Sequence, residues 1–415
     1  MRIWAFPSVY PYEHPGMAWS GIFAHRQYKG LIENGAELKV IIPVSWHPPY
    51  PFSSLHGDWK RASKFKYPRQ RVYDGITVYH PRIANIKPAR FVKKPYPARY
   101  VDSIVSFFHD QQIVLDRSKD IFYAQWLPDA ALVQQAAHRL GVRSAVLGIG
   151  DDIIVYAHES KEYFELLKKT LTEADLRIVN AAFLGREANK ILGTDLHFDV
   201  IYFGVDYDRF RPVSEETTKQ IREEYGIPPD KVVILTVAAA LKRKGWTDLL
   251  DALRTVKGMD DNFALVAVHA APNEVDIVAE AAALGLASNL VNIGEIKPAD
   301  LNRLYNAADI FCLASHWEGL ATVIIEAMAS GVAVITTDVG GHAELIENGV
   351  NGLLVPPKQP GILADKLLLL IGDKERRKKL GANARTFTEH KLGNFADNAG
   401  RLYKLMDGLL SGGER

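Results

Sequence analysis

Residues 309–336 constrain the fold most, because they alternate between two kinds of hydrophobic pattern. An apolar run of strand length at 309–314 (DIFCLA) is followed by a loop, and residues 322–330 (TVIIEAMAS) are rich in helix-forming side chains. Gly331 can end that helix, and a second apolar run follows at 332–336. Because parallel strands need a crossover connection, which a helix supplies, this stretch predicts a parallel sheet covered by helices.

The same alternation extends along the chain. Strands are predicted at 3–7, 38–44, 121–124, 144–147, 176–180, 200–203, 232–238, 265–268, 290–293 and 310–313. Helices are predicted at 22–33, 129–140, 158–171, 183–192, from 246 onward, and at 362–370, 374–386 and 394–410. This βα order predicts open parallel sheets that bind ligands at the carboxyl ends of their strands.

Composition indicates a globular protein of two domains. A chain of 415 residues can bury two cores of ordinary size, and a hydrophobic content of 47% with a net charge of +1 excludes a disordered chain. The single cysteine, Cys312, excludes a disulfide framework and a cysteine zinc site. The first residues, MRIWAFPSVY, are predicted to form a strand and not a signal peptide, and no run approaches ~18 apolar residues. We therefore expect a cytoplasmic protein.

Two glutamates flank the start of the predicted 322–330 helix. Glu318 precedes it and Glu326 lies about one and a half turns inside it, so the carboxylates are roughly 8–10 Å apart along the axis. The helix N-terminus between them favours an anion such as diphosphate. A nucleotide sugar, with hydroxyls on both sides of a diphosphate, fits this spacing. The alternative is two ordinary surface glutamates, but a carboxylate in so apolar a helix requires a partner.

These residues resemble a known family. Residues 318–335 (EGLATVIIEAMASGVAVI) and 340–357 (GGHAELIENGVNGLLVPP) are similar to the C-terminal signature of glycosyltransferase family 4, the retaining enzymes of GT-B fold with an E-x7-E motif. The resemblance implies that Glu318 contacts the donor sugar and that Glu326 binds the ribose. It also implies that the diphosphate is held by the backbone amides of Gly319, Leu320, Ala321 and Thr322.

The resemblance implies an α/β protein of GT-B fold, with two facing Rossmann-like domains, parallel sheets and a deep interdomain cleft. We expect residues 1–205 to form the acceptor-side domain and residues 206–390 to form the nucleotide-sugar-binding domain. A helix within 391–415 is expected to cross back to the first domain. Residues 200–212 (VIYFGVDYDRFRP) resemble the family's link between the two domains, where a hinge would allow closure on a ligand.

Cations for the diphosphate are expected in the loop after the 232–238 strand. The loop reads AAALKRKGW, and the family places there an arginine and a lysine that clamp the diphosphate. Lys244 matches the lysine, whereas Ala239 stands at the place of the arginine, so Lys242 or Arg243 would supply the missing charge. A fixed cation and helix amides can stabilise the leaving diphosphate without a metal, and no D-x-D placed for a divalent ion after a strand is evident. We therefore expect neither a metal nor a cofactor.

Three further candidates come from the resemblance. Ile296 stands where the family's nucleotide base usually sits. Gly21 retains one glycine of a pair that faces the donor phosphate, although a turn glycine is the alternative. Residues 148–152 (GIGDD) stand where family members have H-G-x-D, so Ile149 replaces the histidine, and Asp152, or less favourably Asp151, remains to orient the acceptor. Either aspartate could instead cap a helix.

Residues 60–100 are strongly basic. They contain twelve lysines or arginines against one acid, Asp74, with aromatic residues interleaved. Such a local field can concentrate a phosphate-bearing acceptor or contact an anionic bilayer surface, and a solvated insertion is the alternative. Nucleic acid is not expected as a partner, because no RNA- or DNA-binding motif accompanies the charge.

The sequence therefore predicts a retaining, metal-independent glycosyltransferase, with Glu318, Lys244 and Asp152 as catalytic candidates. The expected donor is a UDP- or GDP-linked sugar, and the expected acceptor is a saccharide or a lipid-linked molecule in surface polysaccharide or glycolipid assembly. The protein would be cytoplasmic or peripheral at the inner face of the membrane. Three alternatives remain: a GT-B nucleotide-sugar epimerase, a non-catalytic nucleotide-sugar-binding protein, and a nicotinamide dehydrogenase, for which the G-x-G-x-x-G fingerprint is lacking.

Overall fold

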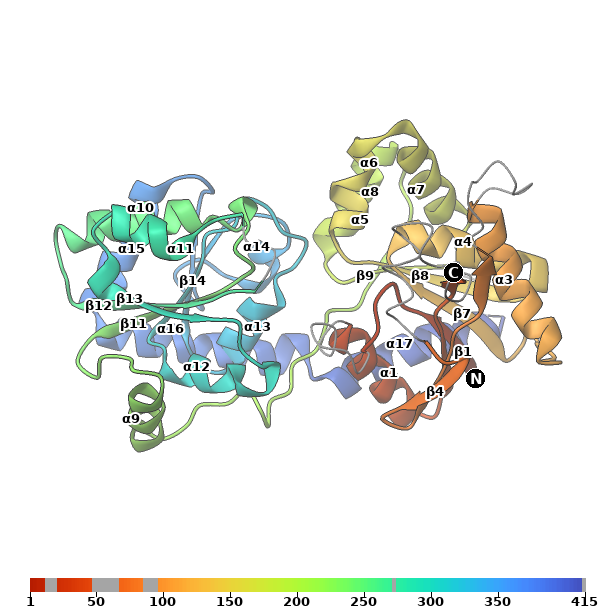
Figure 1. Ribbon diagram of the computed structural model, residues 1–415, viewed down its shortest axis with the longest axis horizontal. Helices are drawn as coiled ribbons and strands as arrows, with labels where there is room; N and C mark the ends of the chain where they lie inside the picture. Colours follow the sequence, from red (N-terminus) through yellow and green to blue (C-terminus); the bar gives the residue numbers. More distant parts are fainter. Residues whose placement is uncertain (12–20, 47–66, 85–95, 271–273, 413–415) are drawn as a thin grey trace, which may run out of the picture. The chain divides into compact units, whose positions relative to one another are not determined.

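The computed structural model describes residues 1–11, 21–46, 67–84, 96–270 and 274–412. The chain divides into two compact units, coloured along the sequence in Figure 1. The N-terminal unit consists of Met1–Asn180, Leu184–Tyr202 and Ala396–Arg415, and the C-terminal unit consists of Ala181–Phe183 and Phe203–Phe395. The structure thus places the first main division at 202/203, where the sequence pattern placed it at 205/206.

An eight-stranded sheet forms the centre of the N-terminal unit, in the order β10-β9-β8-β7-β1-β2-β5-β4. In chain order its strands are β1 (Arg2–Phe6), β2 (Glu37–Ile41), β4 (Gln70–Tyr73), β5 (Ile76–Tyr79), β7 (Asp120–Gln125), β8 (Arg143–Gly148), β9 (Leu176–Val179) and β10 (Asp199–Val200). Two short strands, β3 (Val44–Trp46) and β6 (Arg82–Ala84), pair separately. The central strand β1 has Ile3, Trp4 and Ala5 fully buried, as expected for a parallel strand covered on both faces.

The helices of this unit connect the parallel strands. They are α1 (Ile22–Glu33), α3 (Tyr96–Asp110), α4 (Leu127–Leu140), α5 (Asp151–Ile154), α6 (Tyr156–Glu159), α7 (Lys161–Glu173), α8 (Ala182–Leu192) and α17 (Phe395–Leu410). The single helix predicted over 158–171 is in fact two helices, α6 and α7. They separate at Ser160, whose hydroxyl accepts a hydrogen bond from the Tyr163 N–H at 3.2 Å and so caps α7.

The β4–β5 hairpin departs from the predicted order of alternating strands and helices. The two strands pair antiparallel, with Tyr73 opposite Ile76, across a turn at Asp74 and Gly75. Both turn residues have positive φ, +46° and +79°. Asp-Gly is the sequence that such two-residue turns prefer, because both central positions need a left-handed backbone. The expectation of βα order throughout is therefore wrong at this edge of the sheet.

The C-terminal unit contains a six-stranded parallel sheet in the order β13-β12-β11-β14-β15-β16. Its strands are β11 (Val232–Val237), β12 (Phe263–Val268), β13 (Leu290–Gly294), β14 (Ile310–Leu313), β15 (Ala333–Thr337) and β16 (Leu353–Val355). Its helices are α9 (Glu215–Glu224), α10 (Trp246–Lys257), α11 (Ile277–Ala283), α12 (Leu301–Ala307), α13 (Thr322–Ala329), α14 (His342–Leu345), α15 (Pro360–Gly372) and α16 (Lys374–Phe387).

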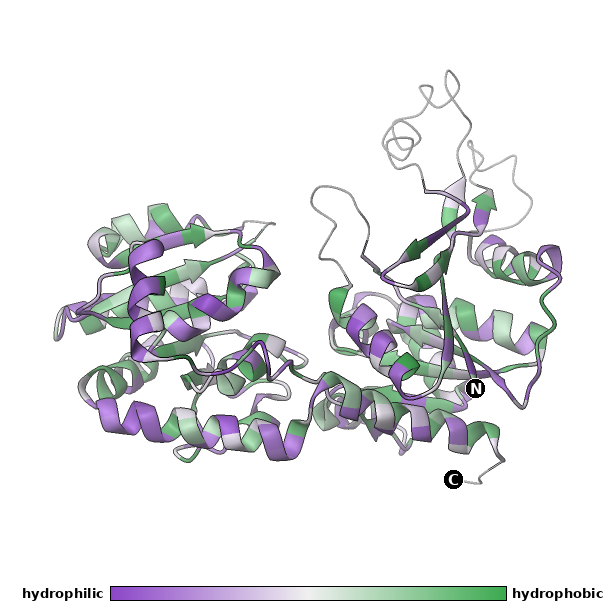
Figure 2. Cartoon of the chain, turned by 90° about the horizontal axis from the view of Figure 1, so that it is seen from below, coloured by the Kyte–Doolittle hydropathy of each residue, from purple (hydrophilic) through white to green (hydrophobic). Residues whose placement is uncertain are grey.

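The core of the C-terminal unit explains why these segments fold as they do. Ile234, Ile310 and Ile335 of adjacent strands are fully buried, and the apolar face of α10 packs on them through Leu249 and Leu253. Figure 2 shows hydrophobic segments along the strands and mixed hydrophobic and hydrophilic faces on the helices. Burial of both sheet faces accounts for the nearly continuous apolar strands of the sequence.

The last helix, α17, belongs to the N-terminal unit. The Asn34 side chain at the end of α1 donates a hydrogen bond to the Ala396 carbonyl at 3.2 Å. Among the described residues, no helix combines the length and the apolar character that crossing a membrane requires.

Candidate active site

The candidate active site lies where the strand order of the C-terminal sheet reverses. The chain runs from β11 outward to β12 and β13 on one side, and then returns to place β14, β15 and β16 on the other side. Because the connections after β11 and β14 leave in opposite directions, the carboxyl ends of these two strands are where an open α/β sheet binds its ligand. Lys244 follows β11 and Glu318 follows β14.

Gly245 allows the two loops to touch. Its φ is +70°, and a Cβ at this position would lie 1.9 Å from the Ala314 carbonyl oxygen, so the backbone there accepts only glycine. In the same contact the His316 N–H donates to the Arg243 carbonyl at 2.8 Å. Lys244 is thereby held against the loop that carries Glu318.

Lys244 and Glu318 form a largely buried ion pair. The Lys244 Nζ lies 2.6 Å from the Glu318 Oε1, and the two side chains are 17% and 8% exposed. The Ser315 hydroxyl donates to the same carboxylate oxygen at 2.7 Å. An ammonium group carries three N–H donors, and this contact uses one of them. The pair can therefore offer a cation to a phosphate and a carboxylate oxygen to a sugar hydroxyl.

The N-terminus of α13 follows Glu318 closely in the chain. The helix begins at Thr322, Ala321 is its N-cap, and no side chain caps its first N–H groups. The Gly319 carbonyl accepts a hydrogen bond from the Gly341 N–H at 2.8 Å, which fixes the loop before the helix, and Leu320 is buried. The four residues predicted to hold a diphosphate are thus consecutive residues that lead into an uncapped helix start, where anions bind.

Glu326 has the partner that its apolar helix requires. It is 8% exposed, and its Oε2 accepts a hydrogen bond from the Tyr305 hydroxyl of α12 at 2.9 Å. Burial and the nearby Glu326 carboxylate raise the pKa of Tyr305 well above its usual value, so the phenol stays protonated and acts as a donor. A carboxylate held in this way can accept from ribose hydroxyls with its remaining lone pairs.

Two other predicted donor contacts, Arg243 and Ile296, belong to the same unit, as does Ala239 at the place of the missing arginine. The Arg243 guanidinium lies 4.6 Å from the centroid of the Trp317 ring, next to Glu318 in the chain. Ala239, at the place of the expected arginine, contributes its carbonyl, which accepts from the Trp246 indole N–H at 3.0 Å. Ile296 is half-buried in the loop after β13. Arg243 is therefore the nearer replacement for the missing arginine, since Lys242 is exposed.

His342 is a site residue that sequence reasoning missed. It is fully buried, its Nδ1 donates to the Thr337 carbonyl at 2.9 Å, and its Nε2 is buried and has no hydrogen-bond partner among the residues that the structure describes. Burial lowers the pKa of His342. The charge of Glu318 acts to raise that pKa, and the charge of Lys244 acts to lower it. The neutral ring is thus electrostatically coupled to the ion pair. Its signal in the sequence was its position directly after Gly340 and Gly341 in the signature stretch.

Asp152 of the N-terminal unit is buried and hydrogen-bonded to the backbone. Its carboxylate accepts hydrogen bonds from the backbone N–H groups of Ile149 (3.1 Å), Gly150 (2.7 Å) and Leu127 (3.2 Å), and 2% of the residue is exposed. Burial raises the pKa of Asp152 to about 6, while these N–H groups act to lower it. The side chain thus ties the start of α4 to the loop after β8. Its role in orienting an acceptor stays a prediction.

Gly21 and Trp126 have unusual backbone conformations in this unit. Gly21 is the N-cap of α1 with φ +74°, and a Cβ there would lie 2.2 Å from the Val9 carbonyl oxygen. Close packing of the turn therefore explains this glycine, and its contact with a donor stays a prediction. Trp126, with φ +74°, directly follows β7. β7 pairs with β1, and the strand order of this sheet reverses between these two strands. A strained non-glycine residue at such a point is a further candidate for ligand contact.

Comparison with known proteins supports the chemistry of this site. Residues 217–387, which include the ion pair and α13, match the family described as glycosyl transferases group 1. The chain is 29% identical over 369 residues to the putative teichuronic acid biosynthesis glycosyltransferase TuaC of Bacillus subtilis, with 88% of each chain covered. The chain is a glycosyltransferase, and its residues 217–387 are similar to group 1 of these enzymes. It is also 30% identical over 261 residues to D-inositol 3-phosphate glycosyltransferase of Nocardia farcinica, covering 61% of this chain and 56% of that protein.

Solved structures show the same fold. Anabaena Alr3699/HepE in complex with UDP aligns with a TM-score of 0.75 at 20% identity, covering 98% of this glycosyltransferase and all of that chain. Sucrose-phosphate synthase from Thermosynechococcus elongatus aligns with a TM-score of 0.76 at 18% identity, covering 99% and 100%. The predictions of a GT-B fold and of a glycosyltransferase are therefore confirmed, and the dehydrogenase alternative is set aside.

Proposed function

We propose that this glycosyltransferase moves a sugar, with retention of anomeric configuration and without a metal or other cofactor, from a nucleoside diphosphate sugar to an acceptor in surface polysaccharide or glycolipid assembly. The observation that carries the proposal is the 2.6 Å contact between Lys244 and Glu318 at the start of α13. In this assignment Lys244 and the α13 N-terminus receive the diphosphate, Glu318 holds the sugar and Glu326 holds the ribose.

The chemical step requires stabilisation of the leaving group. The bond from the anomeric carbon to the diphosphate oxygen breaks, and its electron pair adds negative charge to the diphosphate. The acceptor hydroxyl forms the new bond on the same face of the sugar, and its proton passes to the departing phosphate oxygen. Lys244 and the N–H groups of α13 are fixed before the reaction, so they stabilise the new charge with little reorganisation.

The comparisons support particular substrates. Structures of Anabaena Alr3699/HepE contain UDP and UDP-glucose, and we propose UDP over GDP as the nucleotide on that ground. The relatives are named for teichuronic acid and for D-inositol 3-phosphate, so we propose an acceptor that carries an acidic group. We further propose a cytoplasmic protein with peripheral contact to an anionic membrane through residues 60–100, of which 60–66 and 85–95 lie outside the described residues.

Transfer assays with UDP-sugars test the proposal. Glu318→Gln should lose turnover by about 10²–10³-fold, the usual size of one electrostatic contact to a transition state, and circular dichroism should show that the variant, although less stable, is folded at the assay temperature. Glu347→Gln, which removes an exposed carboxylate of the same unit, serves as the matched control. NMR of the product should show the anomeric configuration of the donor, with a rate unchanged by EDTA. Epimerised or hydrolysed donor in the absence of acceptor would indicate the epimerase, and UDP binding without turnover would indicate a binding protein.

A further inference from the structure

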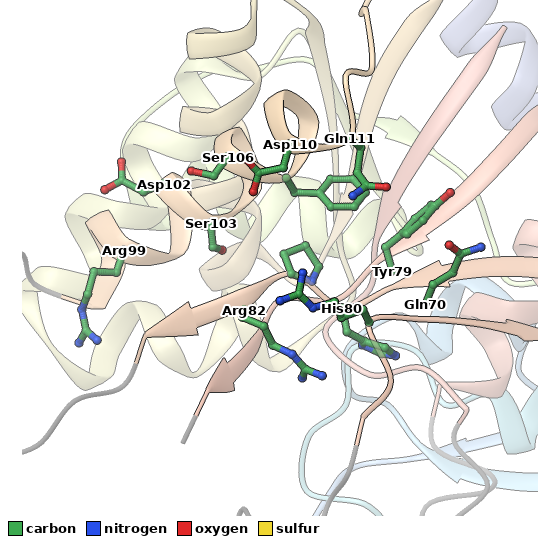
Figure 3. Close-up of a pocket in the computed structure, with 13 residues that line it drawn as sticks. Gln70, Tyr79, His80, Arg82, Arg99, Asp102, Ser103, Ser106, Asp110 and Gln111 are labelled. Atoms are coloured by element: carbon green, nitrogen blue, oxygen red, sulfur yellow. The ribbon is translucent and has the colours of Figure 1, made fainter. Parts of the chain in front are cut away.

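A polar pocket within the N-terminal unit is lined by residues 69–111, which include none of the residues assigned to the donor but overlap the basic stretch 60–100. Its volume is about 410 Å³, which is within the usual range of small-molecule sites. Figure 3 shows side chains from three sources around it: the β4–β5 edge, the start of β6, and helix α3. Three arginines line it, Arg69, Arg82 and Arg99. We name it the arginine pocket.

The topology explains why the arginines meet. The His80 N–H donates to the Arg69 carbonyl at 2.9 Å, which places Arg69 beside the end of β5, and Arg82 begins β6 two residues after His80. Burial lowers the pKa of Arg82, and the charge of Arg69 lowers it further, so the two guanidinium groups repel one another across the pocket. An anion bound between them would remove that repulsion.

The lining of the arginine pocket carries more positive than negative charge, with Arg69, Arg82 and Arg99 against Asp102 and Asp110. Asp102 also accepts a hydrogen bond from the Arg139 guanidinium at 2.8 Å. His80 adds no charge near neutral pH, because burial lowers its pKa to about 4.

Hydroxyl and aromatic groups complete the lining. Ser103 and Ser106 follow Arg99 on one face of α3 at helical spacing, and Asp110 continues that face. The rings of Tyr79 and Phe107 lie 5.0 Å apart between centroids. Sugars bind well to such a mixture, because their hydroxyls pair with serine and carboxylate oxygens while their C–H faces cover aromatic rings.

We propose that the arginine pocket binds the acidic group, carboxylate or phosphate, of an anionic sugar that serves as acceptor. The inference rests on the proposed function, because an acceptor is what a transferase would hold in this unit. A concave pocket favours a small molecule over a bilayer surface, which would need a flat or convex basic face. Arg69 and Arg82 hold the acidic group, and the α3 serines and Asp110 hold hydroxyls.

Titration calorimetry of the full chain tests the proposal with three probes: D-glucuronate, D-glucose 6-phosphate and D-glucose. At least one anionic sugar should bind more tightly than glucose, and Arg69→Gln should weaken that binding roughly tenfold or more. Arg69 is exposed, so its replacement leaves the fold intact. Arg117→Gln, which removes another exposed arginine of the same unit, should leave the affinity unchanged.

Several results would overturn the proposal. Equal affinity for the three sugars, or equal losses in the Arg69 and Arg117 variants, would show that the pocket does not recognise an acidic group. Binding to phosphatidylglycerol vesicles that Arg69→Gln abolishes, without binding of either anionic sugar, would assign the arginines to a membrane surface. UDP titrations distinguish the failure of this proposal from the failure of the proposed function. The Arg69→Gln variant should bind UDP as the wild-type chain does. If the wild-type chain does not bind UDP, the proposed donor site is refuted, and the sugar titrations still test the arginine pocket.

Discussion

Replacing Lys244 should expose how much the C-terminal unit depends on its buried ion pair. Lys244→Met keeps most of the aliphatic stem and leaves the Glu318 carboxylate, 8% exposed, without its cation. Breaking a buried pair by removing one partner costs about 3–5 kcal/mol, because the remaining charge is desolvated and uncompensated. Glu318→Gln in the same chain removes that charge, so the double variant should regain most of the loss.

Native-state hydrogen exchange measures this cost within one unit of a two-unit chain. Amides of β11 and β14 should exchange hundreds to thousands of times faster in Lys244→Met, since each 1.4 kcal/mol corresponds to about tenfold. Arg303→Ala is the control, because it breaks the exposed pair with Glu224 in the same unit and should change exchange little. Wild-type exchange in Lys244→Met, or a double variant that exchanges as fast as the single one, would refute the reasoning.

Three further predictions concern single positions. Gly245→Ala should destabilise the C-terminal unit and abolish transfer, because the new Cβ would collide with the loop after β14. Gly258→Ala is the control and should do neither, because the nearest atom to its Cβ would be 3.4 Å away. Thermal unfolding and transfer assays compare the two variants. Tyr305→Phe removes the hydrogen bond that the Tyr305 hydroxyl donates to Glu326, so it should cost about 1–3 kcal/mol of stability and weaken UDP binding. Chemical denaturation measures the stability and calorimetry measures the binding. An unchanged free energy of unfolding and an unchanged UDP affinity would contradict this role of Tyr305. The pKa of His80 is about 4 in the folded chain and about 6.5 in the unfolded chain, so the unfolded chain takes up the proton first as the pH falls. The free energy of unfolding should therefore fall by up to about 3 kcal/mol between pH 6.5 and pH 4. Urea denaturation across this range measures the loss, and His80→Asn should reduce it.

Local patterns predicted much of the fold because local physics decides it. The helix expected at 22–33 has those bounds in the structure, since Gly21 can take the left-handed N-cap conformation and Asn34 ends the helix. The β4–β5 hairpin was missed although its Asp74-Gly75 turn is a strong signal, because the basic and proline-rich surroundings suggested an insertion without regular structure. At that point the local turn sequence determined the structure, and the composition of the surrounding residues did not.

Residue spacing alone could group only the site residues that are close in sequence, and Lys244, 74 residues before Glu318, was predicted from the family resemblance. Glu318, the start of α13 and Glu326 belong to one loop and helix, so their order along the chain sets their order in space. Tyr305, which partners Glu326, and His342, which is coupled to the ion pair, come from other elements and meet the site only through tertiary packing. No periodicity in the sequence could pair them.

A structure of the chain with UDP bound tests the central claim most directly. The account predicts that the diphosphate lies within hydrogen-bonding distance of the Lys244 Nζ and of the first N–H groups of α13, with the ribose hydroxyls on Glu326. Diphosphate bound elsewhere, with the Lys244–Glu318 contact and the Glu326 carboxylate untouched by the nucleotide, would contradict it.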